Sequence, residues 1–376
     1  MDIKRSVTIL LPDDDDLRAT VAAFQRVQQD LSEAACNHGM PLSAIALHRL
    51  MYTQVVGTLN SQMTCSAIRL TAGAYASAKT NHHAIERPFA FRRARALFLV
   101  GQRGRDADFR QDGSLSIWTV AGRKRTSYAV PDAFKDTLAA AKEIDSLTII
   151  ERKGRLLGRV TVTLEAPDPT GVYPVGIDLN ETNALVAVDL EGHELFISGR
   201  AVKVANKRDY KTRKRVQSKL AAYKAEHRNT HSVRRVLKRL GRKRSNRTRT
   251  FAQTAAKRLV TFAPAHATLV FEALTIPQPR KGVVGGKATR RRLSLWQRQL
   301  IRQAAESKAQ EVGMLVAEIS PKYTSQKCSR CGLLGIRKRH RFSCPQCGHA
   351  AHADVNAAVN IRNRYTVSRH GGLPVS

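Results

Sequence analysis

Four cysteines near the C-terminal end of the chain constrain its fold more than any other feature. They form two pairs, Cys328-x2-Cys331 and Cys344-x2-Cys347, with twelve residues between the pairs and a glycine after each pair. A tight turn at each pair directs both thiols to one point, and four thiolates in tetrahedral geometry suit structural zinc. We therefore expect a zinc ribbon at residues 322–350. A rubredoxin-like iron site has similar turns and is the alternative, but nothing else in the chain supports it.

The cysteines, the apolar runs and the first residues of the chain together argue against two classes of protein. A closed four-cysteine centre leaves no open coordination position, so its zinc should be structural. The remaining cysteines, Cys36 and Cys65, lie in helical stretches and are expected to be buried free thiols, as in a reducing compartment. No apolar run reaches the ~18–20 residues of a membrane span, and residues 1–16, which end in four consecutive aspartates, do not resemble a signal peptide. We therefore do not expect a secreted or membrane-spanning protein.

The net charge points to a polyanionic partner. The chain has 64 Lys and Arg against 30 Asp and Glu, which gives a formal charge of +34. A surface of this kind repels itself and is typical of proteins that bind DNA, RNA or an anionic membrane. Residues 200–250 alone hold 20 Lys and Arg and only two acids. Apolar residues at helical spacing in this segment predict two basic amphipathic helices.

The turn-rich segment 166–171 is the clearest domain boundary. Before it, a strand at 5–11 precedes three helical stretches, and short β-type runs then continue to about residue 165. We predict a small β-domain formed by residues 1–16 and 87–168, with a helical insertion at 17–86. After the boundary, the pattern predicts three closely spaced strands, two basic helices, a strand, a helix, a strand and a last helix. The strands are expected at 172–179, 184–190, 194–199, 267–274 and 314–319, and the last two helices at 293–312 and from Ala353.

Three carboxylates occupy unusual places in this second half. Asp178 and Glu272 each lie inside an apolar strand, where an acid is costly to bury unless it is paired or binds metal. Asp354 begins the last helix. Each acid alone is more often an edge or ion-paired residue. Together they match a ribonuclease-H-like fold, in which an Asp of the first strand, a Glu of the fourth strand and an Asp of the last helix gather over two divalent ions. The predicted fold class is therefore α/β and multidomain.

The residue types explain the chemistry expected of this group. Mg²⁺, and also Mn²⁺, prefers oxygen ligands. Two such ions can activate water and stabilise the leaving oxygen in phosphodiester hydrolysis. Without metal, three clustered carboxylates should raise one another's pKa.

Several segments together resemble one family. They are Val175-Gly-Ile-Asp-Leu-Asn180, Leu269-Val-Phe-Glu-Ala-Leu274, Ser320-Pro-Lys-Tyr-Thr-Ser-Gln-Lys-Cys-Ser-Arg-Cys-Gly332, Cys344-Pro-Gln-Cys-Gly348 and Ala353-Asp-Val-Asn-Ala-Ala358. They are similar to TnpB proteins, the transposon-encoded, RNA-guided DNA endonucleases related to type V CRISPR effectors. The resemblance covers residues 172–365. Asn180 departs from it, since many members have glycine there, but Asn180 is not expected to be a ligand.

The resemblance implies a domain plan and partners. Residues 172–321 and 351–376 would form a RuvC-like nuclease domain, and the zinc ribbon would bind target nucleic acid. The N-terminal region matches only in architecture, as a β-barrel wedge domain with a helical recognition insertion. The implied partners are a guide RNA derived from a transposon end and double-stranded target DNA with a short adjacent motif, without a membrane. The implied location is the cytoplasm of a prokaryote, at the nucleoid.

The resemblance also suggests roles for other residues. Basic residues of the 200–250 segment would contact guide or heteroduplex phosphates, and a solvated helical face is the alternative. Tyr75 and Lys79 are candidates for reading the target-adjacent motif, and Arg330 for a position near the scissile phosphate. Trp296 is expected to pack in the interior or to stack on single-stranded DNA. The expected phosphate contacts are Arg213, Lys214, Arg215, Arg234, Arg235, Arg242, Lys243 and Arg244.

Three other functions stay open. A compact type V CRISPR effector would share the chemistry. A guided DNA-binding repressor would lack cleavage, and the three intact acids argue against it. An unguided strand-transfer transposase would share the ribonuclease-H fold, but the large basic surface and the ribbon placed before the last Asp favour a guided enzyme.

Overall fold

The computed structural model describes residues 1–38, 42–83, 85–101, 105–273 and 298–370. Trp296 lies outside the described residues, as does the start of the helix expected at 293–312. The chain divides into two compact units, Met1–Glu165 and Ala166–Ser376, and each has its own hydrophobic core. Within the described ranges, no helix is long and apolar enough to cross a membrane.

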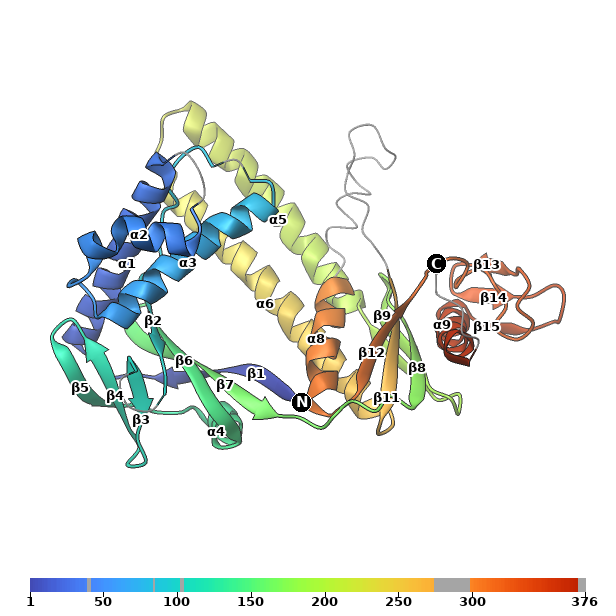
Figure 1. Ribbon diagram of the computed structural model, residues 1–376. Helices are drawn as coiled ribbons and strands as arrows, with labels where there is room; N and C mark the ends of the chain where they lie inside the picture. Colours follow the sequence, from blue (N-terminus) through green and yellow to red (C-terminus); the bar gives the residue numbers. More distant parts are fainter. Residues whose placement is uncertain (39–41, 84, 102–104, 274–297, 371–376) are drawn as a thin grey trace. The chain divides into compact units, whose positions relative to one another are not determined.

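The N-terminal unit packs helices against antiparallel sheets (Figure 1). One sheet has the strand order β1-β7-β6-β2, and the other has the order β3-β4-β5. Isolated bridges join Leu10 to Ala129 and Val100 to Ala107, so strands of the two sheets meet at these points. The elements are β1 (Asp2–Leu10), α1 (Asp15–Asn37), α2 (Ala44–Val55), α3 (Ser61–Thr80), β2 (Arg95–Leu99), β3 (Ala107–Phe109), β4 (Ser114–Thr119), β5 (Gly122–Ser127), α4 (Asp132–Ala139), β6 (Ala141–Arg152) and β7 (Arg155–Glu165).

Local sequence explains the start of this unit. Val7 and Ile9 alternate with exposed or half-buried residues along β1, so one face of the strand enters the core. Helix α1 begins after Asp14, whose side chain accepts a hydrogen bond from the backbone N–H of Leu17 at 3.0 Å. The aspartates of this stretch thus serve as helix cap and first turn, as the sequence predicts.

Tyr75 lies in the core of this unit, which corrects its interpretation as a DNA-reading residue. Its side chain is 1% exposed, and its ring stacks on Phe89 at 4.3 Å between centroids. Its hydroxyl group lies 2.9 Å from the Ser32 hydroxyl and donates to the Ser32 carbonyl at 2.9 Å. A buried, fully hydrogen-bonded phenol cannot reach a base edge, so Tyr75 holds α3 against α1. Lys79, one turn later, is exposed.

The C-terminal unit is built on a five-stranded sheet with the order β10-β9-β8-β11-β12. Strands β8, β9 and β10 form the expected antiparallel meander, and β11 runs parallel to both β8 and β12. All five strands expected from the sequence are present. The elements are β8 (Tyr173–Asp178), β9 (Asn183–Val188), β10 (Glu194–Ser198), α5 (Arg200–Ala225), α6 (His231–Phe262), β11 (Ala267–Glu272), α8 (Arg298–Glu311), β12 (Leu315–Ile319), β13 (Ile336–Lys338), β14 (Arg341–Ser343), β15 (Ala350–His352) and α9 (Ala353–His370).

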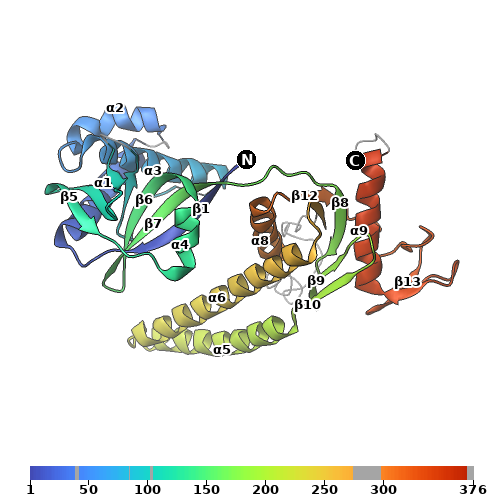
Figure 2. The same cartoon turned by 90° about the horizontal axis from the view of Figure 1, so that it is seen from below.

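Helices cover both faces of this sheet (Figure 2). Along β11, Leu269 and Phe271 pack into the cluster shared with α6 and α8, whereas Val270 packs with Ile361 of α9. The continuous apolar character of β11 is therefore explained by burial on both sides. Helix α9 approaches β8 so closely that a Cβ atom at Gly176 would collide with the backbone carbonyl of Ala358. Glycine in the Val-Gly-Ile-Asp segment is thus required for α9 to lie against the strand that carries Asp178.

Helices α5 and α6 form a hairpin whose outer part has little buried surface. In α5 only Val202 and Asn206 are buried. Arg247 of α6 donates to Asp209 at 2.9 Å and to Asn206 at 3.1 Å, which ties the two helices together. The C-terminal half of α6 packs into the core of this unit through Ala252, Ala255, Ala256 and Leu259. The hairpin is therefore anchored at one end and presents basic side chains to solvent along most of its length.

Candidate active site

The strand topology places Asp178 and Glu272 side by side. Asp178 is the last residue of β8, and Glu272 is the last residue of β11. These strands are adjacent and parallel, so their carboxyl ends meet at one edge of the sheet. Asp354 lies in the first turn of α9, which packs on β8 and β9. The structure thus brings together the three acids that the sequence singles out.

Asp178 is held in a costly environment. The residue is 8% exposed, and burial raises the pKa of its carboxyl group to about 7, with a further contribution from the negative charges of Glu272 and Asp354. Asn180 donates weakly to it at 3.4 Å. Asn180 therefore lies beside Asp178 and acts as a hydrogen-bond donor to its carboxyl group.

Glu272 is positioned by the segment that leads into the ribbon. Burial raises the pKa of its carboxyl group, while the hydroxyl of Thr324 donates to it and lowers the pKa. The positive charges of Arg298 and Arg364 also lower it. Arg364 donates to the carbonyl of Ser320 at 2.6 Å, so it also connects α9 to the end of β12.

Asp354 is paired with an arginine of the ribbon. Its side chain is 1% exposed, and Arg337 Nη2 lies 2.8 Å from its Oδ1. Asn183 Nδ2 donates to its Oδ2 at 2.9 Å. Arg337 also lowers the pKa of both Asp178 and Glu272 by its charge, so one guanidinium faces all three carboxylates.

Arg337, Asn183 and Thr324 are site residues that the sequence did not identify. Residues 337–341 are Arg-Lys-Arg-His-Arg, a basic run suited to phosphate, and nothing in its sequence distinguishes Arg337 from its neighbours. Arg337 lies on β13, whose pairing with β14 sets its direction. The contact with Asp354 spans 17 residues and arises only when the ribbon folds against α9.

The donor chemistry of the carboxylate group fits hard divalent cations. Three carboxylates at one sheet edge are oxygen ligands of the kind that Mg²⁺ and Mn²⁺ prefer. In the described part of the chain, the groups of three or more possible ligands within 4.8 Å of one another are the four cysteines and His340, His352 and Asp354. The three carboxylates are therefore spread wider than the ligands of one ion.

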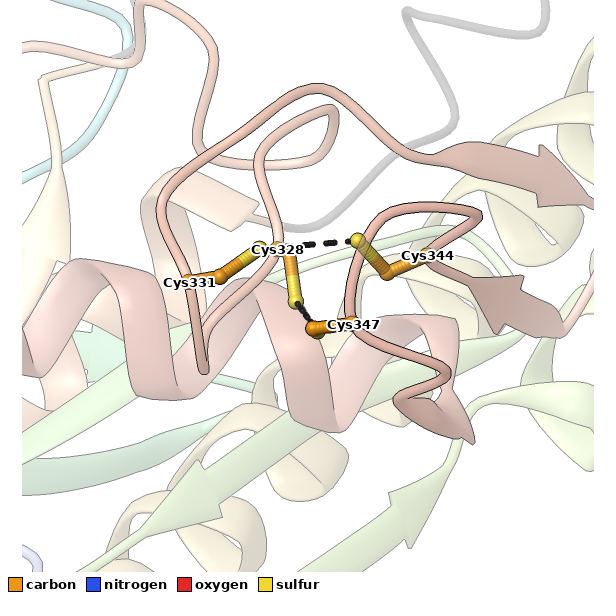
Figure 3. A group of neighbouring side chains, drawn as sticks. All are labelled: Cys328, Cys331, Cys344 and Cys347. Carbon is orange, nitrogen blue, oxygen red and sulfur yellow. Dashed lines mark hydrogen bonds between the residues drawn. The ribbon is translucent and has the colours of Figure 1, made fainter.

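The four cysteines form a compact group (Figure 3). Their sulfur atoms approach in pairs, with Cys328 Sγ 3.7 Å from Cys347 Sγ and Cys331 Sγ 3.5 Å from Cys344 Sγ. Tetrahedral zinc with Zn–S bonds of about 2.3 Å requires sulfur–sulfur distances of about 3.8 Å. Backbone N–H groups of Cys347 and Gln346 lower the pKa of the Cys344 thiol to about 7, whereas burial and the hydrogen bond with Cys344 raise the pKa of the Cys331 thiol to about 12. The cluster therefore fits structural zinc.

Two asparagines of α9 fasten the ribbon to this helix. Asn356 accepts from the backbone N–H of Ser329 at 2.9 Å and donates to the carbonyl of Lys327 at 2.8 Å, on either side of Cys328. Asn360 donates to the carbonyls of Lys327 and Thr324. The segment Ala353-Asp-Val-Asn-Ala-Ala358 thus combines an acid of the site, an anchor for the cysteine turn and small residues that allow close packing on Gly176.

The candidate nucleic-acid residues are largely on the surface. Arg330 is exposed in the first cysteine turn. The expected phosphate contacts on the helical hairpin are all exposed except Arg244, which is half-buried. Their accessibility is compatible with the predicted contacts, which stay predictions. The hairpin set is Arg213, Lys214, Arg215, Arg234, Arg235, Arg242, Lys243 and Arg244.

In protein without divalent cations, Asp178 should make folding less stable as the pH rises. The unfolded carboxyl group ionises near pH 4, whereas the folded group keeps its proton until about pH 7. Between these values the folded state binds more protons, so the free energy of unfolding falls with rising pH, by up to about 4 kcal/mol for a three-unit difference. Thermal unfolding of the wild type and Asp178→Asn at pH 5 and pH 8, without Mg²⁺, checks this. The variant should gain relative stability at pH 8, and a constant difference would contradict it.

Comparison with known proteins identifies two regions of the chain. The family described as "Probable transposase" matches residues 158–279, and the family described as "Cas12f1-like, TNB domain" matches residues 299–361. The chain is 29% identical over 209 residues to the TnpB-like protein aq_aa05 of Aquifex aeolicus, covering 50% of this chain and 66% of that protein. The chain is therefore similar to TnpB proteins over this part of its length.

The chain shares a short segment with a CRISPR nuclease. It is 49% identical over 57 residues to the CRISPR-associated endodeoxyribonuclease Cas12f1 of Sulfoacidibacillus thermotolerans, which is 14% of each protein. The chain therefore spans less than two thirds of the length of these curated relatives.

The fold of this chain is similar to that of solved Cas12 structures. It aligns with Cas12f1 in a complex with sgRNA and target DNA at a TM-score of 0.59 and 14% identity, covering 94% of this chain and 84% of that one. It aligns with CasPhi-2 (Cas12j) bound to crRNA at a TM-score of 0.51 and 12% identity, covering 100% of this chain and 99% of that one. The mixed α/β architecture is therefore shared with Cas12 proteins.

Proposed function

We propose that this chain is an RNA-guided DNA endonuclease that hydrolyses phosphodiester bonds with two divalent metal ions. The observation that carries the proposal is the meeting of Asp178, Glu272 and Asp354 at one edge of a buried sheet. The order β10-β9-β8-β11-β12, with an antiparallel meander followed by two parallel strands, supports a RuvC-like ribonuclease-H domain. Solved relatives hold sgRNA with target DNA or crRNA, which supports a nucleic-acid guide.

The proposed domain plan follows from this function. Residues 172–321 and 351–376 form the nuclease domain, and residues 322–350 form the ribbon that binds target nucleic acid. Residues 1–16 and 87–168 form a β-barrel wedge, and residues 17–86 form the helical recognition insertion. The partners are a guide RNA derived from a transposon end and double-stranded DNA with a short adjacent motif. Lys79 is a candidate to read that motif.

The proposed mechanism assigns a task to each side chain. Bound Mg²⁺ ions would lower the pKa of an attacking water and stabilise the leaving oxygen. Asp178, Glu272 and Asp354 would bind the ions through oxygen. Thr324 holds the Glu272 carboxyl group in place by its hydrogen bond. Arg337, which faces all three acids, is placed to donate to a phosphate oxygen once the acids are occupied.

A guided repressor without cleavage is the main alternative, and the site argues against it. Buried acids that are not needed for catalysis cost stability through desolvation and mutual repulsion. Here two of the three carry pKa values above the ordinary range. A nuclease needs the buried acids to bind its catalytic ions, whereas a repressor would lose the same stability without using them.

The basic hairpin should carry much of the affinity for RNA. Changing Arg213, Lys214 and Arg215 to Gln removes three exposed cations while keeping good helix formers. Each lost phosphate contact lowers the slope of log K against log[salt] by about 0.7–0.9, so the slope should fall by about two to three units. Filter binding of the co-purifying RNA between 50 and 300 mM salt measures it.

A matched control separates a contact effect from general loss of charge. Changing the exposed Lys135, Lys142 and Lys153 to Gln removes the same charge from the N-terminal unit. An equal loss of slope in both triple variants would show that the hairpin is not a specific RNA contact.

The function itself is tested with the purified full chain. One discrete RNA should co-purify through moderate salt, and cleavage of plasmid DNA should require both this RNA and Mg²⁺. Protein stripped of RNA by nuclease should be inactive until the RNA is returned. RNA-free protein that cuts a specific site with Mg²⁺ alone would refute the guided function and favour an unguided transposase.

A further inference from the structure

Two histidines approach Asp354 from the side opposite its partner arginine. His340 lies in the two-residue turn between β13 and β14, and His352 is the last residue of β15. One possible ligand atom from each of His340, His352 and Asp354 lies within 4.8 Å of the others. His352 Nδ1 is 3.8 Å from Asp354 Oδ2, whereas Arg337 contacts Oδ1. One carboxylate thus lies between a cation and a pair of imidazoles.

The backbone holds both histidines in place. His352 pairs with Arg341 across β14 and β15, and the N–H of Ala353 donates to the carbonyl of His340 at 2.8 Å. The two imidazole rings stack, with centroids 5.6 Å apart and planes 22° apart. Phe196 packs edge-on against His352 at 5.1 Å between centroids. The backbone of both histidines is therefore fixed beside Asp354, and only the His340 ring has to adjust to an ion.

We propose that His340, His352 and Asp354 bind a divalent transition-metal ion, with Zn²⁺ as the representative. Imidazole nitrogen suits Zn²⁺, Co²⁺ and Ni²⁺, whereas Mg²⁺ prefers oxygen. Zn–N bonds of about 2.0–2.1 Å require tetrahedral ligands about 3.4 Å apart. Rotation of the exposed His340 ring supplies the remaining approach.

Binding of the ion requires changes in the hydrogen bonds that Asp354 and His352 now make. Asp354 Oδ2 accepts from Asn183 Nδ2, and it has a second lone pair that faces His352. His352 Nδ1 accepts from the backbone N–H of Asp354 at 3.2 Å, a long contact that an ion at this nitrogen would replace. Arg337 can keep Oδ1. The exchange therefore leaves the ion pair between α9 and the ribbon intact.

The site has a regulatory consequence that rests on the proposed function. Asp354 is a ligand for the catalytic ions in that proposal, and its carboxylate cannot serve both sets of ligands fully. Zn²⁺ at the histidines therefore competes with Mg²⁺ for Asp354 and inhibits cleavage. Mg²⁺ does not bind the histidine nitrogens, so it competes with Zn²⁺ only for the Asp354 carboxylate.

Binding is measured on the full chain with its ribbon zinc in place. Titration with Zn²⁺ against a chromophoric chelator should show a second ion per chain in the wild type. His340→Ala should weaken this second ion at least about tenfold, since even loss of an outer partner of a metal ligand costs about 10–100-fold, and should leave the ribbon ion unchanged. His83→Ala, which changes an exposed histidine of the N-terminal unit, should bind like the wild type. One ion in the wild type, or equal second-ion affinity in His340→Ala, would overturn the proposal.

Cleavage provides a second readout. At fixed Mg²⁺ and saturating RNA, and with each protein compared with its own rate without Zn²⁺, His340→Ala should need at least about tenfold more Zn²⁺ for half inhibition than the wild type, in line with its loss of binding. Equal sensitivity would refute the regulatory claim. If no protein cleaves in Mg²⁺, the proposed function fails, and the binding titration still decides whether the metal site exists.

Discussion

Changing Asp178, Glu272 or Asp354 to its amide should abolish DNA cleavage and spare guided DNA binding. The amide keeps the size of the side chain but removes a negative oxygen that binds metal. Loss of a single transition-state hydrogen-bond donor costs an enzyme about 10²–10³-fold, and a metal ligand supports a larger charge, so we expect a loss of at least about 10³-fold. Binding should persist because it depends on the basic surface. Single-turnover cleavage and electrophoretic shifts with the same RNA–protein complex measure both effects.

The control for these variants is Glu318→Gln. Glu318 lies on β12 of the same sheet and pairs with Arg302 of α8, on the face away from α9. The Glu318→Gln variant should cleave DNA at a rate within a few-fold of that of the wild type. Any one of the three amide variants that keeps near-native cleavage would remove that residue from the proposed site. Asp354→Asn also loses its charge pairing with Arg337, so its thermal stability must be compared with that of the wild type.

Replacing one ribbon cysteine should unfold the ribbon and inactivate the nuclease together. Zinc binding to such sites contributes about 10–16 kcal/mol in small zinc-finger peptides, and Cys344→Ser removes one of four thiolates. The ribbon presents Arg337 to Asp354 and is fastened to α9 by Asn356, so its loss should release contacts to the acids. We expect loss of bound zinc, protease sensitivity at residues 322–350 and cleavage reduced at least about 10³-fold, as for loss of a ligand of the site.

Two cysteines outside the ribbon provide the control. Cys36→Ser and Cys65→Ser change thiols of the N-terminal unit and should keep one zinc per chain and full cleavage. Metal analysis of the purified variants decides this directly. A Cys344→Ser protein that retains both zinc and activity would contradict the assignment of the four cysteines to one ion.

The sequence identified the three acids because each breaks an otherwise apolar or small-residue segment. Asp178 and Glu272 end strands that are buried on both sides, where a charge is conspicuous. The cysteine spacing identified the ribbon because a four-thiolate centre needs little beyond its two turns. Local patterns of this kind can be read without knowing what packs against them. The positions of the strands could be predicted for the same reason, because they depend on local apolar patterns.

Contacts between distant segments could not be predicted in this way. Arg337 is one of several cations in a short run, and only the hairpin of β13 and β14 turns it toward Asp354. Tyr75 was a candidate for reading DNA only through the resemblance, whereas α1 and Phe89 enclose it in the structure. Both outcomes depend on tertiary packing, which overrides local pattern.

Exchange of the variable end of the guide tests the central claim most directly. The co-purifying RNA is synthesised with a new sequence at its variable end and is bound to RNA-free protein. It is then incubated with plasmids that carry either the old or the new target beside the same adjacent motif. The account predicts cleavage of the new target alone, and no cleavage with Asp178→Asn. Cleavage that stays at the old target, or that occurs at fixed transposon-end sequences whatever RNA is bound, would contradict it.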